Sequence, residues 1–244
     1  MKAVILAGGQ GTRLRPLTRT INKHLLPVGR QPMIQYGVDK LIRAGIADIM
    51  LITGKEWLGA FALWFGSGAE RRIRLTYRVQ DAPRGIADGL MAAEGFIRPG
   101  EKFVLLLGDN LFEDDLTEQL QAFRAQPAGA RVLLKRVKDP ARYGVPVMAE
   151  GRIVRIEEKP AHPATDYCVT GIYFYDDAVF DIARRLRPSA RDELEITDVN
   201  NAYAQAGQLT YGILRGWWMD AGTFESLHEA AERLMNGGCG PCGP

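Results

Sequence analysis

A glycine-rich segment near the N-terminus is followed closely by fixed positive charges. In LAGGQGTRLRPLT, Gly8, Gly9 and Gly11 allow a tight turn whose backbone N–H groups can approach an anion. Arg13 then offers a planar, permanently charged fork that suits phosphate oxygens, and Lys23 adds an ammonium group. Because the loop follows an apolar strand-like run, it is expected at the carboxyl edge of a sheet, where α/β proteins bind ligands. The pattern indicates a polyphosphate site.

Two common phosphate-binding motifs do not fit the spacing of this loop. A Walker loop requires lysine directly after its last glycine, and Thr12 occupies that position here. A dinucleotide fingerprint that starts at Gly9 and Gly11 would have its third glycine at Leu14. Taken alone, the loop is also compatible with a tight turn that carries solvated arginines.

Two aspartates end apolar runs in distant parts of the chain. Asp109 lies in LLLGDN and Asp220 in GWWMDAGT. Mg²⁺ prefers oxygen ligands and typically takes one or two carboxylates together with substrate phosphates. A strand-end aspartate such as Asp109 can instead cap a turn, and that alternative stays open here. If both aspartates reach one cleft, they provide what metal-assisted phosphoryl chemistry needs.

The histidines and cysteines of the chain indicate no further chemistry. His24, His162 and His228 stand in no recognisable nucleophile motif and lack the H-x-x-x-H spacing of a metal site. Cys168 is isolated. The remaining cysteines, Cys239 and Cys242, supply at most half of a zinc site, so we interpret residues 236–244 as a flexible tail.

Apolar runs and amphipathic stretches alternate along the first half of the sequence. We expect strands at 2–7, 48–53, 72–78 and 102–107, and helices at 31–44, 56–65, 85–96 and 117–125. The second half is richer in strands, expected at 131–137, 145–148, 152–157, 170–175 and 209–215, with helices at 177–186, 197–206 and 223–235. Such alternation predicts an α/β fold with a mostly parallel sheet and helices on both faces.

The bulk composition is that of an ordinary soluble globular protein. Hydrophobic residues make up 46% and charged residues 25% of the 244 residues, and the net charge of +2 favours neither nucleic acid nor membranes as partners. Charges interrupt every apolar run before it reaches membrane length, so we expect a cytoplasmic protein.

The segments GGQGTRLRPLT and NKHLLPVGRQPMI together resemble the sugar nucleotidylyltransferase family, and most closely its glucose-1-phosphate thymidylyltransferases (dTDP-glucose pyrophosphorylases). The resemblance extends from residue 2 to about residue 227. It implies a Rossmann-like nucleotidyltransferase fold, with a central, mostly parallel mixed sheet and a β-rich sugar-binding part. Because no linker is apparent near residue 125, we expect one domain at 1–235, with a nucleotide-binding half at 1–125 and a sugar-binding half at 126–225.

The resemblance also assigns roles to individual residues. It implies nucleotide binding by Gly8, Gly9, Gly11, Thr12, Arg13, Lys23, Gln80 and Gly85, and metal binding by Asp109 and Asp220. It implies sugar-phosphate binding by Tyr143, Gly144, Glu158, Lys159, Val169, Gly171, Arg191 and Trp218. Pro83 and Arg84 depart from the small residues usual beside the base, which leaves the choice of base open, and Asp192 replaces a usual glycine in the loop that carries Arg191.

The activity implied is Mg²⁺-dependent transfer of a nucleotidyl group from dTTP to glucose 1-phosphate, giving dTDP-glucose and pyrophosphate. The sugar phosphate is already an anion, so direct in-line displacement needs no general base. The expected catalytic residues are Arg13, Lys23, Asp109 and Lys159. Arg13 and Lys23 offset the charge on the departing pyrophosphate. Lys159, together with Arg191, reduces the repulsion between the sugar phosphate and the triphosphate.

Several alternatives stay open. UTP differs from dTTP at the base by one methyl group, worth only about 1 kcal/mol when buried, so a UDP-sugar pyrophosphorylase or another nucleotide and sugar-phosphate pair also fits. The same fold could also serve as a non-catalytic nucleotide-sugar sensor. The alternation of strands and helices is compatible with a dehydrogenase as well. Because members of the resembled family usually form homo-oligomers, the resemblance implies a homo-oligomer. The chain resembles a short form without the C-terminal extension of longer relatives, which suggests altered feedback inhibition.

Overall fold

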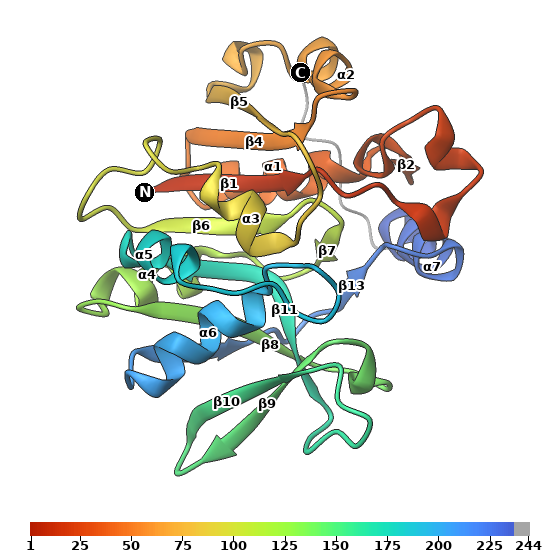
Figure 1. The fold of residues 1–244 in the computed structure, drawn as a ribbon. Helices are drawn as coiled ribbons and strands as arrows, with labels where there is room; N and C mark the ends of the chain where they lie inside the picture. Colours follow the sequence, from red (N-terminus) through yellow and green to blue (C-terminus); the bar gives the residue numbers. More distant parts are fainter. Residues whose placement is uncertain (237–244) are drawn as a thin grey trace.

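Seven strands form the central sheet of the computed structural model, which describes residues 1–236 (Figure 1). The strand order is β12-β8-β11-β6-β1-β4-β5, and the strands are β1 (Lys2–Ala7), β4 (Asp48–Gly54), β5 (Arg74–Gln80), β6 (Phe103–Leu107), β8 (Ala130–Arg136), β11 (Tyr167–Tyr175) and β12 (Leu209–Ile213). Every neighbouring pair is parallel except the two pairs that β11 makes with β6 and β8. The predicted mostly parallel, mixed α/β sheet is confirmed.

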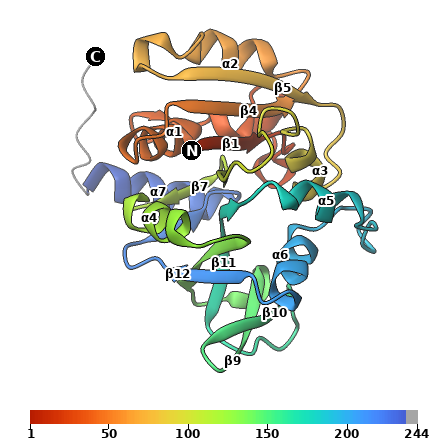
Figure 2. The same ribbon diagram turned by 90° about the vertical axis from the view of Figure 1, so that its left-hand side faces the viewer.

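Helices cover both faces of this sheet (Figure 2). One face carries α3 (Ile86–Met91), α5 (Ala178–Arg184) and α6 (Ile196–Gln205), and the other carries α1 (Met33–Arg43), α2 (Leu58–Phe65) and α4 (Thr117–Ala125). Alternate residues of β1 point to opposite faces, so that Val4 packs in one core and Ile5 in the other. Full burial of such a side chain contributes about 1.5–3 kcal/mol, which makes the two cores the main source of stability.

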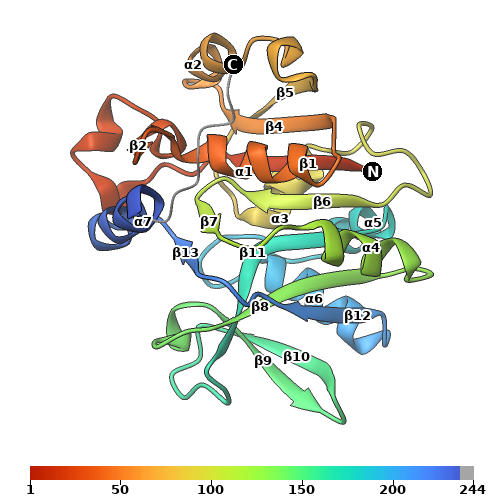
Figure 3. The ribbon, with the colours of Figure 1, turned by 180° about the vertical axis from the view of Figure 1, so that it is seen from behind.

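Three small antiparallel pairs and one helix lie outside the sheet (Figure 3). The hairpin of β9 (Gly144–Ala149) and β10 (Arg152–Glu158) projects from one end and is tied to α6 by Asn201, whose side chain bonds the backbone N–H and C=O of Ile156 at 2.7 and 2.9 Å. Nearer the sheet, β7 (Asn110–Phe112) pairs with β13 (Trp218–Asp220). The last described helix, α7 (Phe224–Asn236), packs on the hairpin of β2 (Pro27–Val28) and β3 (Gln31–Pro32).

The element bounds differ from expectation at several termini. The helix expected at 85–96 ends at Met91, and the following residues form turns in which Gly95 has φ of 85°. The strand expected from residue 72 starts at Arg74, because Arg72 has a left-handed φ of 57°. The short strands β2, β3, β7 and β13 were not predicted. The tail interpretation for residues 236–244, and with it Cys239 and Cys242, lies outside the described residues apart from Asn236.

No helix in the described residues combines the length and apolarity needed to cross a membrane.

Candidate active site

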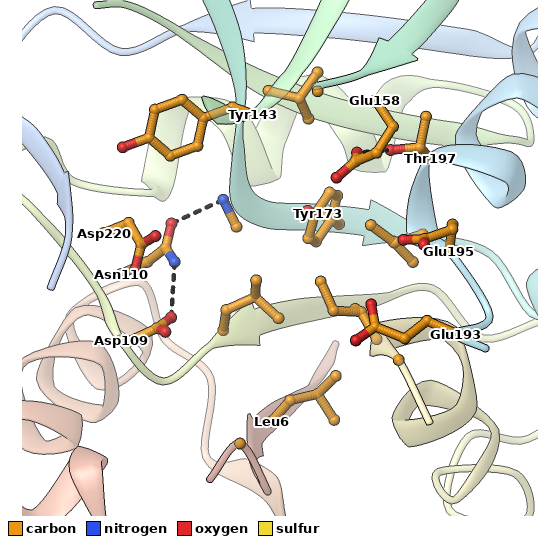
Figure 4. A pocket seen from close by; sticks show the side chains of 18 of the residues that line it. Leu6, Asp109, Asn110, Tyr143, Glu158, Tyr173, Glu193, Glu195, Thr197 and Asp220 are labelled. Atoms are coloured by element: carbon orange, nitrogen blue, oxygen red, sulfur yellow. Dashed lines mark hydrogen bonds between the residues drawn. The ribbon is translucent and has the colours of Figure 1, made fainter. Parts of the chain in front are cut away.

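A cleft lies where the parallel strands of the sheet end (Figure 4). Its volume is about 350 Å³, and its walls come from the residues that follow β1 and β6, the end of β5, the hairpin β9–β10, the start of β11 and the segment that leads into α6. Most residues singled out from sequence line it: Gly8, Gly9, Lys23, Gln80, Gly85, Asp109, Tyr143, Gly144, Glu158, Lys159, Val169, Gly171, Arg191, Trp218 and Asp220.

The remaining three sequence-derived residues, Gly11, Thr12 and Arg13, lie in the turn that follows Gly8 and Gly9 and are not among the residues that line the cleft. Gly11 has φ of 62°, and its carbonyl accepts a hydrogen bond from the Thr18 hydroxyl at 2.7 Å. Thr12 is exposed and starts a short 3-10 turn. Arg13 is 57% exposed, and its Nη2 lies 3.9 Å from Oδ2 of Asp220. The guanidinium therefore stands next to the aspartate and is accessible to a ligand.

An ion pair connects the glycine loop to the end of β6. The ammonium of Lys23 donates a hydrogen bond to Oδ2 of Asp109, and both side chains are nearly buried. Burial acts to raise the pKa of Asp109, but the charge of Lys23, together with weaker contributions from His24 and from hydrogen bonds donated by Lys23 and Asn110, outweighs burial and holds that pKa well below its usual value. Asp109 is therefore a carboxylate with a cation already beside it.

Asp220 reaches the same place from the far end of the chain. It pairs with Asn110 in the β7–β13 ladder, and the N–H of Ala221 donates to the Asp109 carbonyl at 3.0 Å. Burial, followed by the nearby charge of Asp109, raises the pKa of Asp220 to about 6. Its Oδ1 is buried and has no hydrogen-bond partner among the described residues. A buried carboxylate oxygen without a partner is costly unless a cation or donor binds it.

These two carboxylates fit a magnesium ion. The pair offers hard oxygen atoms, one of them unpartnered, and Mg²⁺ usually binds proteins through one or two carboxylates plus phosphate oxygens and water. Within residues 1–236, no group of three or more His, Cys, Asp or Glu side chains is arranged to hold a metal by itself. The remaining ligands would come from substrate and solvent.

Asn110 connects the parts of the site, and the sequence analysis did not identify it. Its Nδ2 donates to Oδ1 of Asp109 at 3.1 Å, and its Oδ1 accepts from the backbone N–H of Gly171 and from the indole N–H of Trp218 at 2.8 and 2.7 Å. A Cβ atom on Gly171 would lie 2.5 Å from this amide, so glycine is required there. The dense network holds Asp109, β11 and β13 in one arrangement.

Charged side chains gather at the opposite end of the cleft. Glu158 accepts a hydrogen bond from the Thr197 hydroxyl at 2.6 Å, and its other oxygen lies 3.7 Å from Nζ of Lys159 and 3.4 Å from Nη2 of Arg191. Arg191 also binds both oxygens of Glu195 at 2.9 Å. Lys159 has a positive φ of 46°, a backbone conformation that is uncommon for residues with a side chain.

Two aromatic residues form the wall between the two ends. The rings of Tyr143 and Trp218 meet edge to face with centroids 5.4 Å apart, and burial raises the pKa of Tyr143 to about 12. Tyr143 is therefore neutral at physiological pH. Trp218 is anchored by its bond to Asn110, so its ring is a fixed part of the cleft wall.

A third part of the cleft joins the end of β5 to the loop that carries Arg191. The N–H of Leu194 donates to the carbonyl of Arg84 at 2.8 Å, and the carbonyl of Leu194 accepts from the N–H of Ala87 at 3.1 Å. Gln80 lies beside this segment, and its Nε2 donates to Oδ2 of Asp88 at 2.7 Å.

His24 has a structural role. It is buried, its Nδ1 lies 2.7 Å from Oδ1 of Asn22, and burial together with the charge of Lys23 lowers its pKa to about 3. A neutral imidazole packed under Gly108 supports the loop before Asp109. Pro83, which the sequence analysis noted beside the base, also lines the cleft, and several other lining residues were assigned no role from the sequence: Arg142, Tyr173, Glu193, Glu195, Thr197 and Asn200.

Comparisons with known proteins agree on one family. The profile of the family described as nucleotidyl transferase matches residues 2–237. A glucose-1-phosphate thymidylyltransferase of Neisseria meningitidis is 47% identical over 235 residues, which are 95% of this chain and 81% of that protein. The corresponding enzyme of Mycolicibacterium smegmatis is 43% identical over 95% of this chain and 81% of its own length.

Known structures agree as well. A crystal structure of a provisional glucose-1-phosphate thymidylyltransferase from Bacillus anthracis, in complex with sucrose, superposes with a TM-score of 0.93 at 50% identity and covers 97% of this chain and 96% of that one. A UDP-glucose pyrophosphorylase in complex with UDP-glucose has a TM-score of 0.85 at 24% identity, over 96% of this chain and 97% of that one, and shares the fold.

Proposed function

The chain belongs to the nucleotidyl transferase family, and we propose that it transfers the thymidylyl group of dTTP to glucose 1-phosphate, giving dTDP-glucose and pyrophosphate. The chain is a nucleotidyltransferase; the two substrates are those that the names of its relatives carry.

One observation carries the proposal. The described cleft holds two groups of charges, with Lys23, Asp109 and Asp220 at one end and Lys159 and Arg191 at the other. An enzyme that joins a triphosphate to a sugar phosphate must hold two anions next to each other, which requires cations on both sides of the reacting phosphorus. Glu158 adds a carboxylate that can accept hydrogen bonds from hydroxyl groups of a sugar.

The proposed mechanism is a direct displacement in which the chain positions reactants and offsets charge. Asp109 and Asp220 would hold Mg²⁺, which when bound supplies charge neutralisation for the phosphate oxygens. Lys23 exchanges its bond to Asp109 for one to the triphosphate, and Arg13 binds the same group from the rim. Both then offset the charge that builds up on departing pyrophosphate.

The sugar phosphate needs orientation more than activation. Its oxygen is already anionic, so attack on the α-phosphorus requires no general base, in keeping with the neutral, buried state of His24. Lys159 and Arg191 hold the sugar phosphate and reduce repulsion between the two anions. Arg191 has to share its charge between the ligand and Glu195, so its loop is expected to rearrange when substrate binds.

The proposal is tested by measuring pyrophosphate release with Mg²⁺ for dTTP, dUTP, UTP, CTP, ATP and GTP against glucose 1-phosphate, glucosamine 1-phosphate and galactose 1-phosphate. Turnover is expected to be highest with dTTP and glucose 1-phosphate. Equal turnover with UTP would reassign the enzyme as a pyrophosphorylase of broader base choice. Nucleotide binding without turnover for any pair would favour a sensor and refute the proposal.

A further inference from the structure

The side-chain amide of Gln80 is held in a single orientation by a neighbour outside the cleft. Gln80 is the last residue of β5 and lines the cleft together with Gly8. Its Nε2 donates a hydrogen bond of 2.7 Å to Oδ2 of Asp88, which lies in the first turn of α3 and is not among the residues that line the cleft.

Chemistry fixes the direction of that hydrogen bond. An amide can present either its NH₂ group or its oxygen to a neighbour, but a carboxylate can only accept. The NH₂ group of Gln80 must therefore face Asp88, and Oε1 must face the other way. The structure agrees, because Oε1 lies 2.8 Å from where a Cβ on Gly8 would be, against the backbone of the glycine loop. No donor among the described residues hydrogen-bonds this oxygen.

We propose that Asp88 is a positioning residue for base selection: it locks Gln80 so that the cleft presents a hydrogen-bond acceptor, and this acceptor selects nucleobases that carry an N–H group at the facing edge. The inference rests on the proposed function and deepens it. Thymine and uracil have such a group at N3, whereas N3 of cytosine is an acceptor. A base that places one acceptor against another leaves both unpaired.

The fixed orientation of Gln80 predicts which pyrimidine nucleotides the cleft can distinguish by their affinity. Mismatched polar groups in a binding site typically reduce affinity on the order of 10- to 100-fold. That discrimination should separate thymine and uracil from cytosine, and it should not separate thymine from uracil, which differ only by a methyl group away from N3. Gln80 without its lock could turn over and donate to N3 of cytosine.

Asp88→Asn tests the lock with little change of shape. An asparagine at this position can accept from the NH₂ group of Gln80 or donate to its oxygen, so both orientations of Gln80 become possible. We expect the binding preference for dTDP over dCDP to fall about 10-fold, mainly through tighter binding of dCDP, with a parallel change in the kcat/KM ratio of dTTP to dCTP. The preference for dTDP over dUDP should change less than about twofold, because both bases present the same N3–H group.

Two further variants control the experiment. Asp81→Asn removes an exposed carboxylate from the segment between β5 and α3, outside the cleft lining, and should leave the affinities for dTDP, dUDP and dCDP unchanged. Asp88→Glu keeps a carboxylate and should retain most of the preference against dCDP. If Asp88→Asn does not fold, Asp88→Ser also offers both a donor and an acceptor and replaces it.

The outcomes separate this inference from the proposed function. An unchanged ratio of dTDP to dCDP affinity in the unlocked variant would overturn the role of Asp88, as would an equal loss of affinity for dTDP, dUDP and dCDP, which indicates a merely structural role. Wild-type protein that binds none of the three nucleotides would overturn the proposed function as well. Wild-type turnover of dTTP with no change in the variant refutes this inference alone.

Discussion

Replacing Asp220 by asparagine should stabilise the metal-free protein while it removes activity. The Asp220 side chain is only 20% exposed, its Oδ1 has no partner among the described residues, and its pKa is raised from 3.8 to about 6. A pKa unit corresponds to 1.36 kcal/mol, so holding this carboxylate ionised in the folded state costs about 3 kcal/mol near neutral pH. Asparagine keeps the shape and removes the charge. Since the amide also needs partners, we expect a net gain of about 1–3 kcal/mol in the free energy of unfolding.

The gain in the free energy of unfolding of Asp220→Asn should increase with pH. A carboxyl group whose pKa is raised by folding binds its proton more tightly in the folded state, so it destabilises the fold increasingly as pH rises from the unfolded pKa of 3.8 to the folded pKa of about 6. Below this window the cost disappears, and above it the cost is constant. The advantage of Asp220→Asn should therefore be small at about pH 4 and complete at about pH 7.

Urea denaturation in EDTA measures the change in the free energy of unfolding. The control is Asp139→Asn, which removes an exposed carboxylate and should change stability by less than about 0.5 kcal/mol. Added Mg²⁺ should stabilise wild type more than Asp220→Asn. Loss of a metal interaction worth several kcal/mol should lower kcat/KM on the order of 10³-fold. A variant that is less stable than wild type at neutral pH without metal, or that keeps wild-type activity, would refute the reasoning.

Three further changes test other parts of the site. Lys23→Met leaves Asp109 buried without its cation and should lower the free energy of unfolding by about 3–5 kcal/mol in metal-free buffer; an unchanged urea midpoint would contradict the ion pair. Arg191→Gln should raise the KM for glucose 1-phosphate about 10-fold or more with little effect on the KM for dTTP, and equal effects on both would speak against its assignment. Trp218→Phe removes one hydrogen bond to Asn110 and should cost about 1 kcal/mol of stability, measured by urea denaturation; a change below about 0.3 kcal/mol would mean that the bond contributes little.

Long, strongly patterned segments were predictable because their signal is local. The helix expected at 117–125 has the observed bounds, and the apolar run at 102–107 forms the strand β6 (Phe103–Leu107). The pair β7–β13 was not predictable, because three-residue strands show no periodicity and their partners lie about a hundred residues apart in the sequence. Their pairing is set by the tertiary fold.

The same distinction holds for the site. Asp109 and Asp220 stood out because they follow apolar runs, and the structure brings both to one cleft. Asn110 stands beside Asp109 in the sequence but carries no spacing signal, and its importance follows only from its contacts with Gly171 and Trp218. The resemblance implied that Gln80 binds the nucleotide, and its contact with Asp88 assigns the side-chain amide one orientation that the sequence does not show.

The proposed reaction is tested most directly by following a mixture of purified protein, Mg²⁺, dTTP and glucose 1-phosphate by mass spectrometry and a pyrophosphate assay. We expect one dTDP-glucose to form for every pyrophosphate released, and neither product to form when glucose 1-phosphate is left out. Pyrophosphate released without the sugar phosphate, or no dTDP-glucose while dTTP binds, would contradict it.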